Sequence, residues 1–248
     1  MAIALLAAGA SALPQIRPWE YFNELAGGSA NGYRYFIDDS VDLGQRTKEF
    51  TQFARRELQP KGVRPSCWYW DSGDEFKARG VDCFGSDPQH DQPIEETCER
   101  TGTIFLGPID FSPSRYWDRP ALRQTTPVAR FGNAFVFRGT FYLPGHAAAV
   151  MYWRGIAKLY LQKPDEAAAE KAFLRSVELD PTAYFVYIQL GNLYLKRGDQ
   201  ERALRAYSDA LKFAGNDSHF HSQIQEQIQR VSAENLANIA PLRDPYME

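Results

Sequence analysis

Acidic side chains gather where short apolar runs of the sequence end. Asp38 and Asp39 directly follow residues 33–37, which are rich in aromatic and branched residues, and Asp42 lies three positions further along. Carboxylates that converge on one point can bind a hard cation or act as an acid and base pair. Aspartate is also common after strands, because it forms turns and caps helices, and no glycine-rich phosphate loop accompanies these acids. We favour the turn-forming role, keep the three aspartates as a candidate ligand site, and expect neither a catalytic residue nor a cofactor.

The three cysteines are the second group of residues that could do chemistry. None of them forms a CxxC pair, so the spacing indicates neither a zinc ribbon nor a thioredoxin-type redox centre, and no metal site is expected. Cys67 stands in an apolar run and is interpreted as a buried small hydrophobic residue. Cys83 and Cys98 bracket a polar loop, which a disulfide between them would close in an oxidising compartment. These two residues are therefore the candidate disulfide pair.

Composition narrows the class of protein. The 248 residues suit two domains, and 44% hydrophobic with 24% charged residues indicates a folded chain. Lys and Arg number 28 against 31 Asp and Glu, which gives a formal net charge of -3. A chain without a cationic surplus lacks the field that gathers phosphates, so nucleic acid is not an expected partner.

Residues 29–145 show short apolar runs separated by Gly, Pro and acidic residues, a pattern typical of strands and loops around one helix. The expected elements are strands at 33–37, 67–70 and 103–106 and a helix at 46–58. This order predicts a small, mainly parallel sheet of the α/β class. Residues 130–137, with a Gly-Asn pair inside them, are expected to add a strand or hairpin that ends the domain.

The second part of the chain, residues 146–248, contains an internal repeat. Seven positions recur 34 residues later with the same residue class: Trp153, Ile156, Ala157, Tyr160, Ala169, Phe173 and Ser176 recur as Tyr187, Leu190, Gly191, Tyr194, Ala203, Tyr207 and Ala210. Small residues at such positions let two antiparallel helices approach closely, and aromatic rings fill the remaining gaps. The pattern resembles two copies of the tetratricopeptide repeat over residues 150–217. Residues 220–236 have one apolar face and are expected to form a capping helix, so this domain is expected to be all-α.

The tetratricopeptide resemblance implies a concave groove that is lined by the first helix of each copy and that binds a protein partner. Carried over from the family with the 34-residue offset, the partner-binding candidates are Met151, Arg154, Lys158, Leu161, Gln162, Phe185, Ile188, Asn192, Leu195 and Lys196. The basic members would donate charge-assisted hydrogen bonds to an acidic segment or a carboxyl terminus. The alternative is that they are ordinary solvated surface positions.

A second resemblance rests on residues 21–28, 31–35 and 39–45. These stretches are similar to the region that follows the last membrane helix in bacterial polytopic glycosyltransferases related to the protein O-mannosyltransferases, which use a polyprenyl-phosphate sugar. The resemblance implies an extracytoplasmic, periplasmic domain beside a membrane. It implies no transferase activity, because the acidic catalytic residues of that family belong to a membrane-embedded part whose pattern this sequence does not show.

The apolar residues 2–13 leave three interpretations open. The run is shorter than the roughly 20 residues that span a bilayer. It could be a signal peptide, the end of a membrane helix or a docking segment. Residues 1–28 are therefore treated as an apolar segment and linker that could associate with a membrane.

The sequence as a whole predicts a non-catalytic interaction or assembly subunit that acts at a membrane surface through a tetratricopeptide groove. Its partner would be a protein segment or a membrane protein complex. The alternative is an accessory or carboxyl-terminal part of a polyprenyl-phosphate-sugar-dependent glycosyltransferase. In that alternative Asp38, Asp39 and Asp42 would contact a sugar or a cation.

Overall fold

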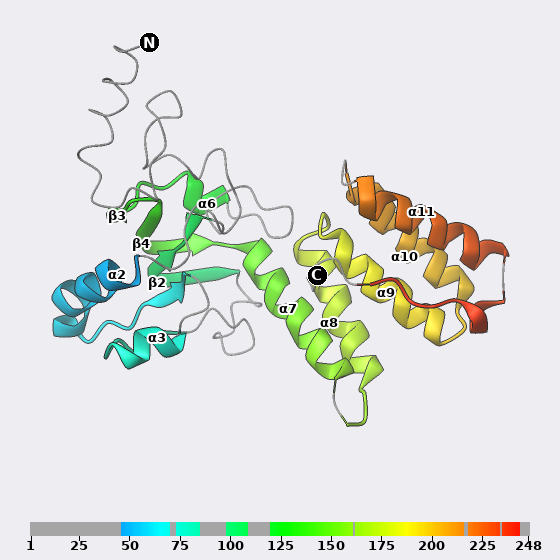
Figure 1. Cartoon of the computed structure of the whole chain (residues 1–248), viewed down its shortest axis with the longest axis horizontal. Helices are drawn as coiled ribbons and strands as arrows, with labels where there is room; N and C mark the ends of the chain where they lie inside the picture. The colour runs from blue at the N-terminus through cyan, green and yellow to red at the C-terminus, as the bar shows by residue number, and fades with distance from the viewer. Residues whose placement is uncertain are drawn as a thin grey trace, which may run out of the picture. The chain divides into compact units, whose positions relative to one another are not determined.

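The fold is taken from a computed structural model of the chain, in which two compact units are distinguished (Figure 1). It describes residues 46–69, 73–84, 98–108, 120–160, 162–215, 218–233 and 235–243. The first unit comprises Met1–Gln92 and Glu99–Leu143, and the second comprises Pro93–Cys98 and Pro144–Glu248. The first unit carries a small sheet, and the second carries paired helices. The strand expected at residues 33–37 and the three candidate aspartates lie outside the described residues.

The helix expected at residues 46–58 is confirmed. It consists of α2, Thr47–Phe53, a π-helical turn, Ala54–Leu58, and a closing 3-10 turn, Gln59–Lys61. Its buried face recurs every fourth residue, at Phe50, Ala54 and Leu58, as helical geometry requires of an amphipathic helix. The helix ends at Gly62, whose φ of 63° is left-handed and suits a residue without a Cβ.

The sheet of the first unit has the strand order β1-β2-β4-β3 among the residues described. The strands are β1, Ser66–Trp68; β2, Glu99–Leu106; β3, Ala129–Phe131; and β4, Ala134–Tyr142. Only β1 and β2 run parallel, whereas β4 pairs antiparallel with both β2 and β3. The prediction of a mainly parallel sheet is therefore wrong. The expected hairpin is confirmed, and it makes the sheet mixed because a tight turn can join only antiparallel strands.

One aromatic core joins the helices to the sheet. Phe50 of α2 stacks on Phe105 of β2 with ring centroids 4.6 Å apart. Phe76 of the short helix α3, Gly73–Ala78, lies 5.9 Å from the same ring. A further short helix, α6, Pro120–Arg123, contacts β4 and buries Leu122. The helices α2 and α3 therefore cover the same face of the sheet.

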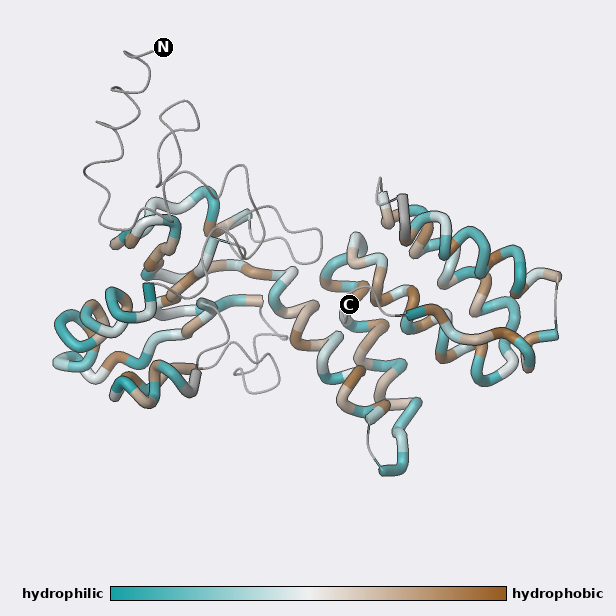
Figure 2. Tube along the Cα trace, viewed as in Figure 1, coloured by the Kyte–Doolittle hydropathy of each residue, from teal (hydrophilic) through white to brown (hydrophobic). Residues whose placement is uncertain are grey.

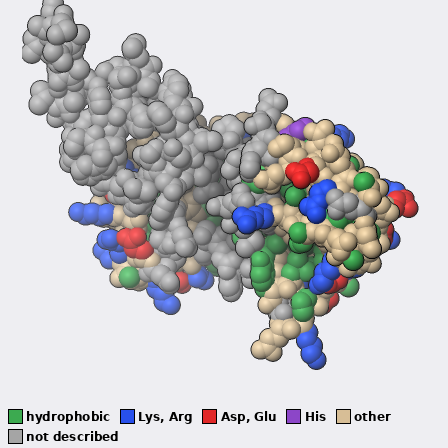
Figure 3. All heavy atoms as spheres, turned by 45° about the vertical axis from the view of Figure 1, so that its right-hand side comes forward, with side chains coloured by type: hydrophobic (Ala, Val, Ile, Leu, Met, Phe, Trp, Pro, Cys, Tyr) green, Lys and Arg blue, Asp and Glu red, His purple; other side chains and the backbone are tan. Residues whose placement is uncertain are grey.

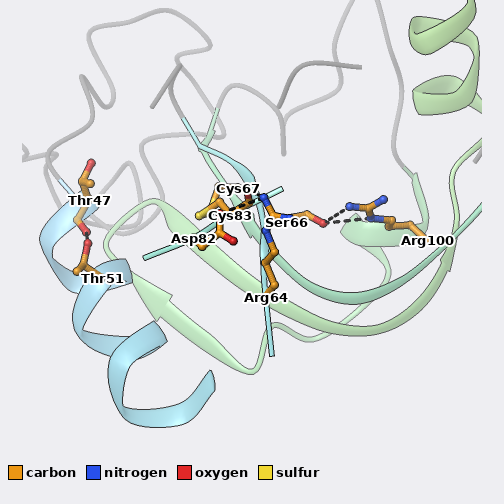
Figure 4. Close-up of a disulfide and its surroundings, with 8 residues drawn as sticks. All are labelled: Thr47, Thr51, Arg64, Ser66, Cys67, Asp82, Cys83 and Arg100. Carbon is orange, nitrogen blue, oxygen red and sulfur yellow. Dashed lines mark hydrogen bonds and ion pairs between the residues drawn. A yellow bond between two sulfur atoms is a disulfide. The ribbon is translucent and has the colours of Figure 1, made fainter. Parts of the chain in front are cut away.

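The cysteine pairing differs from the prediction. Cys67 forms a disulfide with Cys83, with Cα atoms 5.8 Å apart, and Cys98 is buried as a free thiol. The backbone brings the pair together: Cys67 N–H donates to the carbonyl of Phe84 at 2.9 Å, so Cys83 lies beside β1 (Figure 4). The predicted pair of Cys83 and Cys98 is wrong because this contact with β1 was not visible in the cysteine spacing.

The second unit consists, in its described part, of successive antiparallel helices (Figure 1). They are α7, Pro144–Leu159; α8, Glu166–Leu179; α9, Tyr184–Lys196; α10, Gln200–Phe213; and α11, Ser218–Ala233, followed by a 3-10 turn, Leu236–Asn238. Helix α7 packs on α8, α9 on α10, and α10 on α11. Figure 2 shows more hydrophobic residues along α9 than along α11, as expected if α11 covers the end of the helical stack.

Two aspartates fix where the second helix of each pair begins. Asp165 accepts a hydrogen bond from Ala168 N–H at 3.0 Å, and Asp199 accepts one from Arg202 N–H at 3.1 Å. An aspartate at this position satisfies a backbone donor that would otherwise have no partner within the helix. None of the described helices combines the length and the hydropathy needed to cross a membrane.

Candidate functional site

Glycines mark the points where the helices of each pair come closest. A Cβ placed on Gly155 of α7 would lie 2.4 Å from the ring of Phe173 on α8. A Cβ placed on Gly191 of α9 would lie 2.5 Å from the ring of Tyr207 on α10. Both rings are fully buried, and buried side chains are packed too closely to move aside at low cost. Gly155 is therefore the structural equivalent of Gly191.

This equivalence changes the repeat register. Gly155 and Gly191 are 36 residues apart, whereas the rings of Phe173 and Tyr207 are 34 apart. The pairing of Ala157 with Gly191, which the 34-residue offset predicted, is wrong. The first helices of the two copies are related by 36 residues and the second helices by 34.

Hydrogen bonds in the turns show the same shift. Asp165 N–H donates to the carbonyl of Lys158 at 3.1 Å, and Asp199 N–H donates to the carbonyl of Tyr194 at 2.9 Å. The donors are 34 residues apart and the acceptors 36. The turn between α7 and α8 is therefore two residues longer than the turn between α9 and α10.

With the corrected register, equivalent positions of the two copies line one groove. The groove has a volume of about 590 Å³. From α7 and the residue after it come Ile156, Leu159 and Tyr160, and their equivalents on α9 are Asn192, Leu195 and Lys196. Tyr160 is 73% exposed, which is high for a large aromatic residue. Figure 3 shows hydrophobic side chains gathered on one side of the helical unit.

The structure brings only some of the predicted partner-binding residues into this groove. Asn192, Leu195 and Lys196 line it, whereas Arg154 and Lys158 are not among its lining residues. Met151, Phe185 and Ile188 are buried. Gln162 is exposed outside the lining, and Leu161 lies outside the described residues. In the first copy, Ile156, Leu159 and Tyr160 line the groove but were not among the residues predicted to do so. The sequence feature that could have identified them is Gly155, two positions before Ala157.

The groove is apolar rather than basic. Lys196 is the one charged side chain among the described residues that line it, and its Nζ lies 2.6 Å from Glu166 Oε1. The cluster of basic side chains that was expected to bind an acidic segment is therefore not found among the described residues that line this groove. Its lining instead offers aliphatic side chains, one aromatic ring and the amide groups of Gln189 and Asn192.

One wall of the groove is formed by residues 235–243, which run back across α9 and are called the return segment below (Figure 1). Asn192 Nδ2 donates to the carbonyl of Leu242 at 2.9 Å, and Leu242 N–H donates to Asn192 Oδ1 at 2.9 Å. Gln227 Nε2 of α11 donates to the carbonyl of Ala240 at 2.9 Å. Side-chain amides therefore hold the backbone of the return segment at alternate residues.

Tyr207 fixes the orientation of the Asn192 amide. Its hydroxyl donates to Asn192 Oδ1 at 2.8 Å, while its ring packs against Gly191. Burial raises the pKa of Tyr207 to about 12, so the hydroxyl keeps the proton that it donates. Because Oδ1 is engaged by this hydroxyl, Nδ2 is directed toward the return segment.

A charge network joins α8 to the end of α9. The Arg197 guanidinium contacts the carboxylates of both Glu166 and Glu170, and the Tyr194 hydroxyl donates to Glu170 Oε1 at 3.0 Å. The hydrogen bond from Lys196 lowers the pKa of Glu166, and the one from Arg197 lowers the pKa of Glu170. Both carboxylates are therefore held in the charged form.

A second groove lies in the first unit. It has a volume of about 430 Å³ and is lined by Glu49, Gln52, Phe53, Arg56, Glu57, Val128, Ala129, Phe131 and Arg138. Its lining carries charges of both signs and suggests no particular ligand. Within the described part of the chain, no three His, Cys, Asp or Glu side chains are placed to hold a metal ion.

Comparison with known protein families identifies part of the helical unit. Residues 152–182 and residues 172–205 each match a tetratricopeptide repeat. A search of curated proteins and of solved structures found no match to the chain. Residues 152–205 therefore contain tetratricopeptide repeats, which use their concave surfaces for protein–protein interaction and are typically non-catalytic. The resemblance to glycosyltransferases receives no support from these comparisons.

Proposed function

We propose that the helical unit binds an extended, mostly apolar segment of a protein partner in the groove between α7 and α9. The proposal rests on one observation: structurally equivalent residues of the two repeats line the same groove. They are Ile156, Leu159 and Tyr160 in the first repeat and Asn192, Leu195 and Lys196 in the second. Corresponding positions of successive repeats form the continuous surface that such proteins use for binding. The chain would act as a non-catalytic interaction or assembly subunit.

The lining of the groove indicates the chemistry of the partner. Aliphatic side chains favour burial of apolar surface, and the exposed ring of Tyr160 is the kind of aromatic side chain that anchors interfaces. The Lys196 ammonium is already paired with Glu166, so an acidic partner would have to compete with that carboxylate. An uncharged segment with aliphatic residues therefore fits better than the acidic segment expected from the sequence.

An extracytoplasmic location at a membrane surface is part of the proposal. The disulfide between Cys67 and Cys83 supports it, because disulfides persist mainly in oxidising compartments. The apolar residues 2–13 support it as well, although they lie outside the described residues. A partner in a membrane protein complex would suit this location.

Peptide selection tests the groove. A random peptide library is selected against the full chain, and the affinities of the enriched peptides are measured by fluorescence anisotropy. We expect peptides rich in aliphatic residues, and we expect Leu159→Glu to weaken their binding by about tenfold or more, because a charge would be buried against apolar groups. Failure to enrich any groove-dependent peptide would contradict the proposal.

A matched leucine provides the control. Leu174 lies on α8, is 41% exposed and does not line the groove. Leu174→Glu adds the same charge to the same helical unit and should leave peptide affinity unchanged. Equal loss of binding in the two variants would argue against recognition in the groove. Thermal unfolding of both variants verifies that they remain folded.

A further inference from the structure

The return segment is held mainly through its backbone. The N–H and the carbonyl of Leu242 both meet the amide of Asn192, and the carbonyl of Ala240 meets Gln227. In an extended chain, the N–H and carbonyl of one residue point to the same side, as they do at a strand edge. Such hydrogen bonds do not depend on which side chains the segment carries. The Asn192 side chain therefore recognises an extended backbone rather than a particular sequence.

The side chains of the return segment match the chemistry proposed for the partner. Leu236, Ile239, Pro241 and Leu242 line the groove, and Ile239 is buried. No charged residue occurs from 235 to 242. After the 3-10 turn, residues 239–242 are thus an uncharged, mostly aliphatic and extended stretch, which is the kind of ligand that the groove lining favours.

We infer that the return segment is an intramolecular ligand of the groove and competes with the partner for Asn192, an inference that rests on the proposed function. Both hydrogen-bonding groups of the Asn192 amide are engaged by Leu242. Asn192 is also the structural equivalent of Ile156 in the other repeat, and both residues line the groove. A partner segment that contacts these equivalent positions of both repeats must therefore contact Asn192. The return segment therefore has to leave before such a partner binds.

Tethering strengthens this competition. A segment on the same chain is present at a high effective concentration, which for short flexible connections reaches the millimolar range. The affinity measured for a competing partner falls in proportion to the fraction of protein in which the return segment has left Asn192. A variant with a released segment should consequently bind the partner more tightly.

A release variant tests the inference in the full chain. Ile239→Asp combined with Leu242→Asp places charges on two side chains of the segment that line the groove and leaves α7 and α9 unchanged. The control combines Asn238→Asp with Ala240→Asp, which adds the same charge at exposed positions outside the lining. The probe is a fluorescent synthetic peptide with the sequence of residues 235–243.

We expect the release variant to bind this peptide about tenfold more tightly than the unmodified chain or the control. Adding Asn192→Ala to the release variant should remove the gain. Equal affinity of the unmodified chain and the release variant would overturn the inference. Thermal unfolding of each variant verifies that α9 and its neighbours remain folded.

The peptides selected against the groove separate the two proposals. If they bind the unmodified chain and the release variant equally well, the groove is a binding site but the return segment does not compete for it. If no peptide binds either protein in a groove-dependent way, the proposed function fails and the inference fails with it.

Hydrogen exchange measures directly whether the return segment leaves Asn192. The Leu242 amide should lose its protection from exchange when a selected peptide binds. Continued protection would show that the peptide binds alongside the segment and would overturn the inference.

Discussion

Gly155 of α7 packs against the ring of Phe173 so closely that a methyl group does not fit between them. The contact sets the depth at which α7 and α8 cross, and it places Ile156, Leu159 and Tyr160 on the groove side of α7. The corresponding contact between Gly191 and Tyr207 places the equivalent residues of α9 on the groove side of that helix. The groove is thus a consequence of where the glycines lie.

Gly155→Ala should lower the free energy of unfolding by about 1–3 kcal/mol, the usual cost of adding a methyl group to a tightly packed contact. Denaturant unfolding measures the change, and Gly191→Ala should have a similar effect. In an uncrowded helix the same substitution would instead stabilise the chain by about 1 kcal/mol, because alanine is the better helix former. Stabilisation by Gly155→Ala would therefore contradict the equivalence of Gly155 and Gly191.

Local features of the fold could be predicted from the sequence. The helix at residues 46–58, the hairpin at residues 130–137 and the paired helices follow from periodicity and turn residues, which act over short distances in the chain. The strand order and the pairing of Cys67 with Cys83 depend on contacts between distant segments, which periodicity does not encode.

The candidate site could be predicted only in part, for a specific reason. Three residues carried over to the more regular copy, Asn192, Leu195 and Lys196, do line the groove, and their contact with a partner stays a prediction. The 34-residue offset misplaced the residues of α7 because the turn before Asp165 is two residues longer than its counterpart. The return segment was not predicted at all, since its bond to Asn192 joins residues 50 positions apart.

Tyr207→Phe should loosen the return segment while leaving the helix crossing intact. The variant keeps the ring that packs on Gly191 and removes the hydroxyl that donates to Asn192. We expect a loss of about 0.5–1.5 kcal/mol in unfolding free energy, typical of one hydrogen bond, and faster exchange of the Leu242 amide. Tyr160→Phe, at an exposed tyrosine, is the control and should change neither quantity. An unchanged exchange rate in Tyr207→Phe would show that the hydroxyl does not orient the Asn192 amide.

The carboxylates of Glu166 and Glu170 should make the helical unit sensitive to acid. Their pKa values are lowered in the folded chain by Lys196 and Arg197 from the ordinary value of 4.5. Their contribution to stability is therefore fully present above about pH 4.5 and is lost as the pH falls through the lowered values. Thermal unfolding between neutral and acidic pH measures the loss.

Glutamine substitutions attribute this acid sensitivity to particular residues. The double variant Glu166→Gln and Glu170→Gln should show a flatter decline in melting temperature with falling pH, because it has two fewer shifted carboxylates to protonate. Glu178→Gln removes a carboxylate from the exposed pair with Arg175 and should leave the decline nearly unchanged. A double variant that declines as steeply as the unmodified chain would assign the effect to other groups.

Alkylation under denaturing, non-reducing conditions should modify one cysteine, Cys98, because Cys67 and Cys83 are joined. Proteolysis without reduction, followed by mass spectrometry, should recover the two peptides that contain Cys67 and Cys83 as one linked species.

Removing the disulfide with Cys67→Ser should lower the free energy of unfolding by about 2–4 kcal/mol, as the loss of a native disulfide commonly does. Cys98→Ser leaves the bridge in place and should change the modified-thiol count from one to none. Recovery of Cys83 linked to Cys98 would contradict the pairing, which follows from the hydrogen bond between Cys67 and Phe84 at the edge of β1.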